Sequence, residues 1–337
     1  MSVPLWLALY VVLAVMTVFS TARASHYIHE IDGKTKISGA LLGGVVLATV
    51  TSLPEFITTI TSTVALESPG LAFGNVFGSN MFNLLILAVV DLVFVKHLFF
   101  DKTRTGIKTN ALIILMYLIF IVPFASIRFT ALGIDFFNIT IGLMFSFVSL
   151  MIIIVYIFAL RSMSQELPQE KVVSNSALSL KSASIRFTLW AVAVILSSYF
   201  ITVVTDGLAS ELNLSASFAG AIFLGAATSL PELTAVITLF KLKSYDIALG
   251  NILGSNVFNM TIISVVDFIN LRQHIFDVFE TDQGLAENIG FLLILGLVNS
   301  IIVMVALLRK RSRNVWTYMI PSVLIVISYS VYIVLSL

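Results

Sequence analysis

Several residue types that mark soluble domains and reactive sites are scarce or absent in this sequence. The 337 residues include no cysteine, which excludes disulfides and thiolate metal ligands. Only 11% of the residues are charged, against about 25% in an average soluble domain, and the formal net charge is +1. This balance gives no case for nucleic acid as a partner. The four histidines fall in loops between apolar segments, and no two of them form a convincing metal site.

Apolar residues dominate instead, at 58% of the chain. Apolar runs of about twenty residues recur from one end to the other, and each is long enough to cross a hydrocarbon core of about 30 Å. Unbroken runs of this length are typical of transmembrane helices, since barrel strands are shorter and alternate in polarity. We therefore expect an all-α integral membrane protein in a lipid bilayer. Its ten predicted helices span residues 3–22, 38–66, 71–94, 108–126, 136–160, 186–206, 215–240, 245–268, 286–308 and 314–336.

The first predicted span resembles a secretory signal sequence in one respect only. Ala22-Arg23-Ala24 looks like a cleavage site, but no lysine or arginine precedes Arg23, whereas a signal sequence opens with positive charge. We therefore expect this segment to be retained as the first membrane helix.

The basic residues predict how the chain is oriented. If the N-terminus is outside and the chain crosses ten times, 17 of the 19 lysines and arginines fall in inner loops, and only Arg128 and Arg272 lie outside. Basic residues favour the cytoplasmic side of a membrane. We therefore expect a multi-pass protein of the cell membrane with extracellular N- and C-termini and a cytoplasmic loop at 161–185.

Two short motifs occur twice, in the same order. TSLPE occupies residues 51–55 and again 228–232, and GNVFGSNMFN at 74–83 returns as GNILGSNVFN at 250–259. The glutamate and the last asparagine are 28 positions apart in the first copy and 27 in the second. Such agreement predicts an internal duplication.

The duplication divides the ten spans into two five-helix repeats. The first covers 1–160 with its motifs at 48–83, the second covers 186–337 with its motifs at 225–259, and 161–185 is a cytoplasmic linker. Because five is odd, the second repeat enters the membrane from the opposite side. Inverted repeats of this kind are typical of secondary transporters, whose ion sites lie at the membrane midplane.

Glu55 and Glu232 stand inside apolar spans, where a carboxylate costs about 3 kcal/mol to insert. No lysine or arginine lies in the core of either span, so a bound cation is the simplest way to neutralise them. The alternative is a pair of protonated glutamates hydrogen-bonded between helices, but the duplication of the whole set of oxygen-bearing residues favours a cation. The side chains in that set are Glu55, Glu232, Thr51, Ser52, Thr228, Ser229, Ser79, Ser255, Asn83 and Asn259.

These oxygen donors suit a hard cation such as Ca²⁺ or Na⁺ and argue against zinc or copper. In each second motif the serine and the last asparagine are four positions apart, so they share a helix face. The proline before each glutamate removes a helical N–H, which frees backbone carbonyls nearby, with Ala48 and Gly225 as candidates. Two ionised glutamates give a charge of −2, which one Ca²⁺, Na⁺ ions or protons can cancel. No cofactor and no obligatory protein partner are expected beyond these transported ions.

These motifs resemble the two alpha-repeats of the sodium/calcium exchanger family, within the cation/calcium antiporter superfamily. The resemblance covers all ten predicted helices, is most specific at TSLPE and GNxxGSNxxN, and points to a prokaryotic-type member. It implies exchange of Ca²⁺ against Na⁺ at one central site, no enzymatic reaction, and sliding of the first and sixth spans across an eight-helix core. The family's central glutamates fall on Glu55 and Glu232. Its hydroxyl and carbonyl ligands fall on Thr51, Ser52, Thr228, Ser229, Ser79, Ser255, Ala48 and Gly225.

One position departs from the family pattern and leaves the coupling ion open. Many members have aspartate where this chain has Asn259, so a third carboxylate is missing here. Proton-coupled calcium exchangers of the superfamily usually carry GNxxE around the glutamate, and TSLPE therefore favours sodium. An H⁺/Ca²⁺ antiporter, or an antiporter of another cation, remains the main alternative. A cation channel is disfavoured by the inverted repeat, and an intramembrane hydrolase by the lack of a nucleophile–base pair.

The other polar residues in the predicted spans can be explained without a role in ion binding. Asp91 and Asp267, each eight residues after its asparagine, are expected to be solvated acids near span ends. Four further asparagines are expected mainly to stabilise helix contacts; they are Asn75, Asn80, Asn251 and Asn256.

Overall fold

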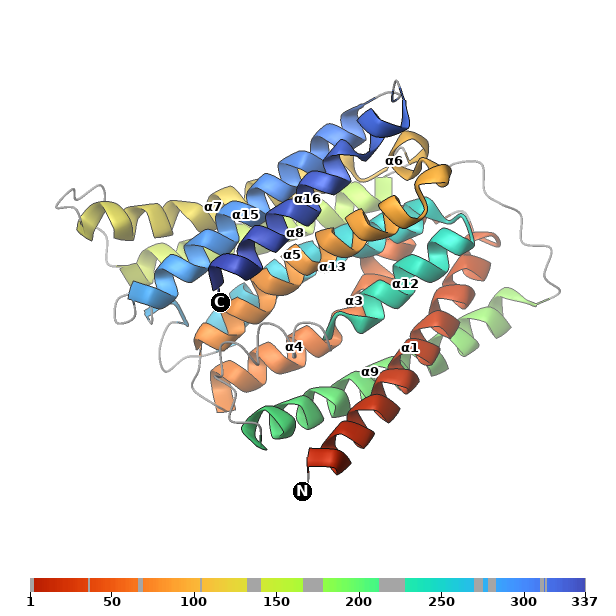
Figure 1. Ribbon diagram of the computed structural model, residues 1–337, viewed down its shortest axis with the longest axis horizontal. Coiled ribbons are helices and arrows are strands. Elements are labelled where there is room, and N and C mark those ends of the chain that lie inside the picture. Colours follow the sequence, from red (N-terminus) through yellow and green to blue (C-terminus); the bar gives the residue numbers. More distant parts are fainter. Residues whose placement is uncertain are drawn as a thin grey trace.

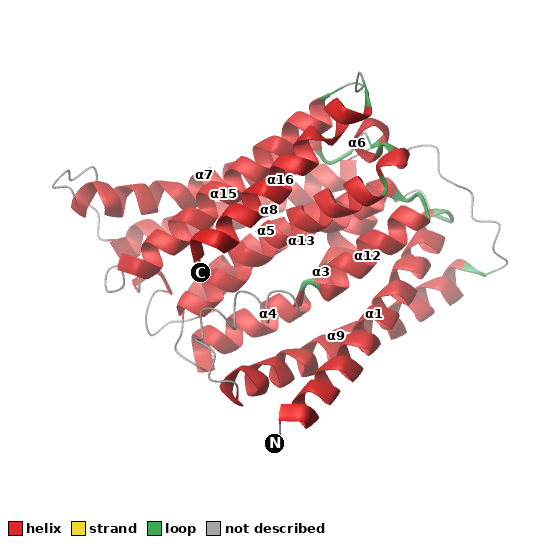
Figure 2. Cartoon of the chain, viewed as in Figure 1, coloured by secondary structure: helices red, strands yellow, loops and turns green. Residues whose placement is uncertain are grey.

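The protein is described from a computed structural model, and every regular element among the described residues is a helix (Figures 1 and 2). The described residues are 3–35, 37–65, 69–103, 105–131, 141–165, 178–211, 228–269, 275–277, 283–309, 312 and 314–336. In chain order the elements are α1 (Val3–Asp32), α2 (Gly39–Leu41), η1 (Leu42–Leu47), α3 (Ala48–Thr51), α4 (Leu53–Ile60), η2 (Thr61–Ala65), α5 (Pro69–Val93), η3 (Val95–His97), α6 (Phe99–Lys102), α7 (Ile107–Ala131), α8 (Ile141–Gln165), α9 (Leu180–Glu211), α12 (Leu230–Lys241), α13 (Tyr245–Ile269), η5 (Ile275–Asp277), α15 (Gln283–Leu308) and α16 (Val315–Ser336).

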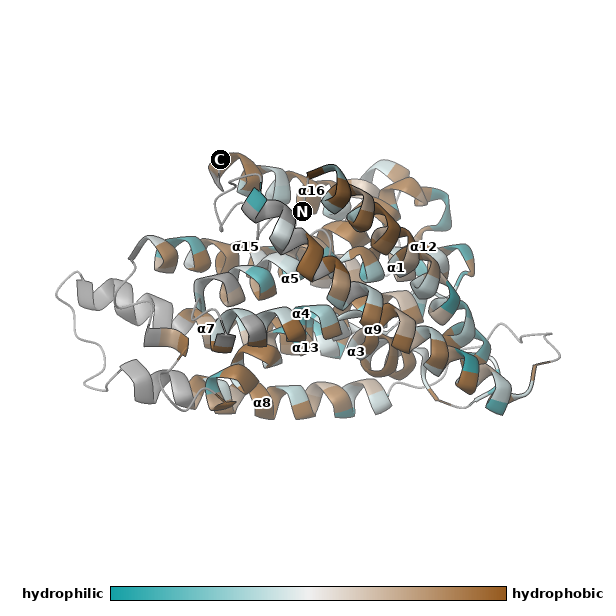
Figure 3. Cartoon of the chain, turned by 90° about the horizontal axis from the view of Figure 1, so that it is seen from below, coloured by the Kyte–Doolittle hydropathy of each residue, from teal (hydrophilic) through white to brown (hydrophobic). Residues whose placement is uncertain are grey.

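The predicted class, an all-helical membrane protein, is confirmed. Within the described residues seven helices are long and apolar enough to cross a membrane, and two bent helix pairs raise the total to nine. These nine correspond to nine of the ten predicted spans. Of the remaining one, 215–240, only residues from 228 onward are described, where the chain forms α12. Hydrophobic residues predominate along the described part of α8 (Figure 3).

The predicted boundaries need two corrections. Helix α1 continues to Asp32, about ten residues beyond the predicted span. His26 and His29 were expected in a loop and instead lie in its last turns, whereas His274 lies outside the described residues. The linker was predicted to cover 161–185, but both of its ends are helical. Helix α8 runs to Gln165, and α9 begins at Leu180.

Helices α1 and α9 form an antiparallel pair at the periphery (Figure 1). Trp6 lies against Gly207 near one end, and the Thr17 hydroxyl donates a buried hydrogen bond of 2.9 Å to Ser197 in the middle. The protein buries only 11% of the most apolar window of α1, against 78% for α13. The pair therefore faces lipid along most of its surface.

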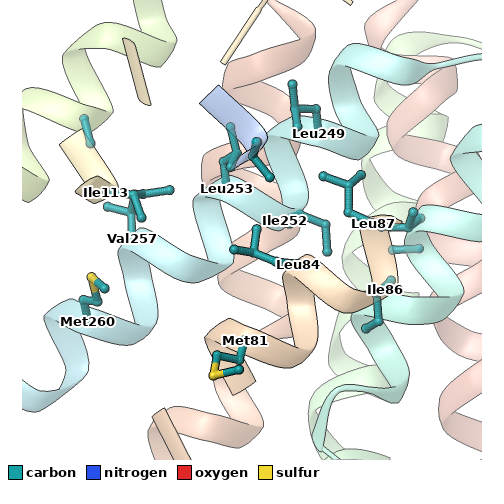
Figure 4. Packing of buried hydrophobic residues seen from close by; sticks show 14 of the residues in the cluster. Met81, Leu84, Ile86, Leu87, Ile113, Leu249, Ile252, Leu253, Val257 and Met260 are labelled. Atoms are coloured by element: carbon teal, nitrogen blue, oxygen red, sulfur yellow. The ribbon is translucent and has the colours of Figure 1, made fainter. Parts of the chain in front are cut away.

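Helices α5 and α13 occupy the centre and carry the two copies of the GNxxGSNxxN motif. They pack against each other, as do α7 and α15, so corresponding helices of the two repeats are neighbours. Leu84 and Leu87 of α5 and Ile252 of α13 belong to one buried apolar cluster, where their side chains point toward one another (Figure 4). A pseudo-two-fold relation between the repeats requires such pairing.

Each repeat also reaches across to the last helix of the other. The Asp91 carboxylate on α5 accepts hydrogen bonds from Tyr318 and Ser322 on α16, and Asp267 on α13 accepts one of 2.9 Å from Ser149 on α8. The expectation that these aspartates are solvated was wrong, because both are buried within the helix bundle. Buried carboxylates need such donors, and the two sets join the repeats at corresponding places.

Glycines bring the irregular first half of the second span into backbone contact with α13. A Cβ added to Gly254 would lie 2.1 Å from the carbonyl oxygen of Gly44, and one added to Gly43 would lie 2.2 Å from that of Ile247. Residues 42–47 form a π-helical turn, a widened geometry often found near functional sites. In the second repeat the motif glycines therefore allow two backbones to come into contact. Around Gly74 and Gly78 no described atom lies within 4 Å of such a Cβ.

We predict that Gly254→Ala lowers the free energy of unfolding by about 1–3 kcal/mol, because the new methyl group meets backbone atoms that cannot rotate away. Gly290→Ala on α15 is the matched control, since a Cβ there has no described atom within 4 Å. Thermal unfolding of the two purified variants in detergent measures the difference. Equal midpoints for both variants would contradict the observed contact.

Candidate functional site

In both copies of TSLPE a helix starts directly after the serine, and in the first copy another helix ends directly before it. Ser52 has φ −97° and ψ 6°, and Ser229 has nearly the same values, −90° and 4°. A new helix starts at the next residue, α4 at Leu53 and α12 at Leu230. Proline, which lacks an N–H, is favourable in a first helical turn. The helices on either side of Ser52 meet at an angle of 43°, so the break predicted from the proline is confirmed there.

The break places each glutamate in the first turn of a helix. Glu55 is the third residue of α4 and Glu232 the third of α12, and both side chains are fully buried. The unpaired N–H groups of a helix N-terminus favour negative charge. Local geometry therefore offsets part of the cost of holding a carboxylate inside the membrane.

Hydrogen bonds join the two motifs across the repeats. The Ser52 hydroxyl donates to Glu232 Oε1 at 3.0 Å, and Ser255 of α13 donates to the same oxygen at 3.3 Å. The Thr51 hydroxyl lies 3.5 Å from that of Ser255. Glu55 is close enough to Glu232 for their charges to interact. The two sequence motifs, about 180 residues apart, thus form one site.

The second motifs supply the remaining side chains from α5 and α13. Asn83 and Asn259 are buried and use their amide nitrogens in hydrogen bonds to the other repeat, at 3.0 and 3.1 Å. Ser79, also buried, makes no side-chain hydrogen bond with a described residue. Ser255 is the only one of these four that bonds directly to a glutamate within the described part of the chain.

Many oxygens of this site have no hydrogen-bond partner among the described residues. Buried polar atoms are nearly always paired, so a group of unpaired ones needs an explanation such as a bound ion or water. The unpaired atoms are both carboxylate oxygens of Glu55, Glu232 Oε2, Ser79 Oγ, Ser229 Oγ, Asn83 Oδ1 and Asn259 Oδ1. Among the described residues no lysine, arginine or histidine forms an ion pair with either glutamate.

The structure joins Thr51, Ser52, Ser255 and Glu232 by direct contacts. Ser79, Asn83 and Asn259 form no hydrogen bond to either glutamate among the described residues. The two carbonyls are not placed at the site either. Gly225 lies outside the described residues. The Ala48 carbonyl accepts hydrogen bonds from the Ser52 N–H at 2.9 Å and from the Thr51 hydroxyl at 3.3 Å, both within the same broken helix. A role for either carbonyl in cation binding stays a prediction.

Three asparagines prove to be closer to the site than expected. The Thr51 hydroxyl donates to Asn251 at 3.3 Å, and the amides of Asn80 and Asn256 bond to Asn259 and Asn83. Their position in a duplicated motif was the available signal. The sequence alone did not distinguish a contact to a site residue from an ordinary contact between helices.

The assembled groups define what the site can bind. It contains two carboxylates and neutral hydroxyl and amide oxygens, and no cluster of three or more Asp, Glu, His or Cys occurs among the described residues. With both glutamates ionised its charge is −2. Oxygen donors of this kind prefer Ca²⁺ or Na⁺, and they offer no soft ligand for a transition metal.

Comparison with protein families identifies one match. The chain matches the family described as sodium/calcium exchanger protein over residues 5–163 and 182–337. The unmatched residues between these two stretches fall at the predicted linker.

Individual relatives are more distant. An uncharacterized membrane protein of Methanocaldococcus jannaschii is 26% identical over 66% of this chain and 67% of its own length. The inner membrane protein YrbG of Escherichia coli is also 26% identical, over 76% of this chain and 77% of its own length. A solved structure of the sodium-calcium exchanger NCX_Mj superposes with a TM-score of 0.67 and 18% identity, covering 98% of this chain and 99% of that one. At that identity the likeness concerns the fold.

Proposed function

Because the chain belongs to the sodium/calcium exchanger family, and is therefore a membrane transporter of cations rather than an enzyme, we propose that it exchanges Ca²⁺ for Na⁺. The two ions bind in turn at the site between α4, α5, α12 and α13, which opens alternately to the two sides of the membrane. The observation that carries the proposal is the group of unpaired buried oxygens around two glutamates that have no basic partner among the described residues.

The proposed ligands are the residues that line this site from both repeats. The two glutamates supply the charge, and the hydroxyls and amides complete a coordination shell of neutral oxygens, of which Ca²⁺ takes six to eight in total. The full proposed set is Glu55, Glu232, Thr51, Ser52, Thr228, Ser229, Ser79, Ser255, Asn83, Asn259 and the carbonyls of Ala48 and Gly225.

Two observations support alternating access with extracellular termini. The α1–α9 pair is peripheral and faces lipid, so it can slide without breaking the core. On the side expected to be cytoplasmic, α1 reaches the turn between α12 and α13, where His29 Nδ1 lies 2.5 Å from the Ser244 hydroxyl. The distribution of basic residues supports an orientation with these ends inside the cell and both termini outside.

Sodium is the proposed coupling ion, and H⁺ is the second candidate. The sequence around both glutamates is TSLPE, and a solved structure that superposes on this chain is that of a sodium-calcium exchanger soaked with Na⁺ and Sr²⁺. Protons compete with cations for any carboxylate, and this chemistry keeps the second candidate open.

We predict that Ca²⁺ stabilises the purified wild-type protein and that Glu55→Gln or Glu232→Gln reduces this stabilisation to less than about 1 kcal/mol. A ligand at one hundred times its dissociation constant contributes about 2.7 kcal/mol to stability. Loss of one buried charged partner weakens binding by about 2–5 kcal/mol, which is at least about thirtyfold. Thermal unfolding with and without Ca²⁺ measures both; Glu287→Gln, at an exposed position on α15, is the control. Wild-type stabilisation in either site variant would overturn the proposed site.

We predict that Ca²⁺ uptake into proteoliposomes requires an outward-directed Na⁺ gradient and saturates with Ca²⁺. An imposed pH gradient without Na⁺ should give little uptake. Uptake driven equally well by the pH gradient would replace Na⁺ by H⁺ as the coupling ion. Uptake that needs no counter-ion on the opposite side would indicate a channel.

We predict that Ca²⁺ binding weakens as the pH falls from 8 to 5. Each carboxylate must be ionised to bind the cation, and a proton that occupies it removes one of the two negative charges. Isotope binding at a series of pH values measures the effect. An affinity independent of pH across this range would show that the carboxylates are not the ligands.

A further inference from the structure

Four buried asparagines, two from each repeat, form a closed set of hydrogen bonds between α5 and α13. Asn83 Nδ2 donates to Asn256 Oδ1 at 3.0 Å, and Asn259 Nδ2 donates to Asn80 Oδ1 at 3.1 Å. Asn80 and Asn256 in turn each donate to the main-chain carbonyl of the other, at 3.1 and 3.3 Å. We call these four residues the asparagine clasp. All four are at most 1% exposed.

The two main-chain carbonyls determine which way every amide in the clasp points. A carbonyl oxygen can only accept, so the atom of Asn80 that faces Asn256 O must be its nitrogen. Asn80 Oδ1 then faces Asn259 and can only accept, so Asn259 must present its own nitrogen there. The Asn259 oxygen is thereby directed away from the clasp. The same argument, started from Asn80 O, orients Asn256 and then Asn83.

The oxygens left over are the ones that the cation site needs. Asn83 Oδ1 and Asn259 Oδ1 have no hydrogen-bond partner among the described residues, and their serine neighbours one turn earlier belong to the site. In the empty site a freely rotating amide would present N–H as readily as oxygen, and it would have to turn before a cation could bind, because N–H repels a cation. The orientation of the clasp removes that alternative.

We propose that Asn80 and Asn256 are positioning residues, which hold the amides of Asn259 and Asn83 with their oxygens toward the cation. As a result, cation binding requires asparagine rather than aspartate at position 259. This inference rests on the proposed function. It concerns residues that are not ligands themselves and act only through the two asparagines that they orient.

The clasp also explains why a carboxylate does not fit at 259 in this chain. An ionised carboxylate there would face Asn80 Oδ1, acceptor against acceptor. Asn80 cannot turn its nitrogen toward the carboxylate without placing its oxygen against Asn256 O. A third negative charge therefore disturbs the clasp, although it would otherwise attract Ca²⁺.

The test is a double-mutant cycle on Ca²⁺ affinity, measured by isotope binding to the purified protein at pH 8. We expect Asn80→Ala to weaken binding about tenfold, the factor that corresponds to one hydrogen bond of about 1.4 kcal/mol. Asn259→Asp alone should also bind more weakly than the wild type. The double variant Asn80→Ala/Asn259→Asp should bind about tenfold more tightly than Asn259→Asp alone, because the opposing oxygen is gone.

Asn110→Ala is the matched control. Asn110 is a fully buried asparagine on α7 whose amide donates to the Ser300 carbonyl on α15 at 2.8 Å, a bond between helices outside the site. The Asn110→Ala variant should have a lower thermal unfolding midpoint and an unchanged Ca²⁺ affinity. If Asn80→Ala does not fold, Asn256→Ala tests the same role on Asn83.

The outcomes separate the clasp from the proposed function. If Asn80→Ala and Asn256→Ala lower only the thermal midpoint, as Asn110→Ala should, the positioning role is wrong and the asparagines merely join two helices. The proposed specificity is wrong if Asn259→Asp binds Ca²⁺ more tightly than the wild type and the double variant Asn80→Ala/Asn259→Asp binds no more tightly than Asn259→Asp alone. A wild-type protein that binds no Ca²⁺ would instead overturn the proposed function, and with it the cation that the clasp serves.

Discussion

The structure depends on the burial of two carboxylates without a basic partner among the described residues. Glu55 and Glu232 are fully buried in the bundle, and a pair of like charges in an apolar medium is unfavourable by several kcal/mol. Each lies at a helix N-terminus, and Glu232 also accepts two hydroxyl donors. These contributions reduce the cost but leave both oxygens of Glu55 unpaired among the described residues. The remaining charge must be balanced by protons or, as proposed, by a bound metal cation.

The rest of the fold brings the two halves of this site into register. Contact between α13 and the second span requires small residues, because the backbone of Gly254 lies against that of Gly44. Contact between α5 and α13 is fixed in depth by polar bonds. The asparagines provide such bonds near the site, and Asp91 and Asp267 provide them farther along the same helices. Each of these contacts joins one repeat to the other. The repeats therefore hold each other in place, while the peripheral α1–α9 pair takes little part.

Much of this arrangement followed from repetition in the sequence. The break at Ser52 could be predicted because TSLPE places proline inside an apolar run, and the meeting of the two motifs because two such runs each carry one glutamate. The burial of Asp91 could not be predicted, because its partners Tyr318 and Ser322 are more than 200 residues away and no residue near Asp91 in the sequence indicates them. The role of Asn80 was equally hidden. A motif shows that an amide is present, whereas its direction depends on the carbonyl of Asn256 in the other repeat.

An exchanger must also release what it binds, and the composition of this site suits that requirement. A site of several carboxylates around Ca²⁺ would hold the ion tightly, since affinity rises with the charge of the ligands. Here only two of the side chains carry charge, and the helix N-termini and the hydroxyls of Ser52 and Ser255 stabilise the carboxylates when no ion is present. The free energy of the empty site is thereby brought closer to that of the occupied one. As proposed ligands, the neutral amides of Asn83 and Asn259 would complete the coordination without adding charge, so that binding remains reversible.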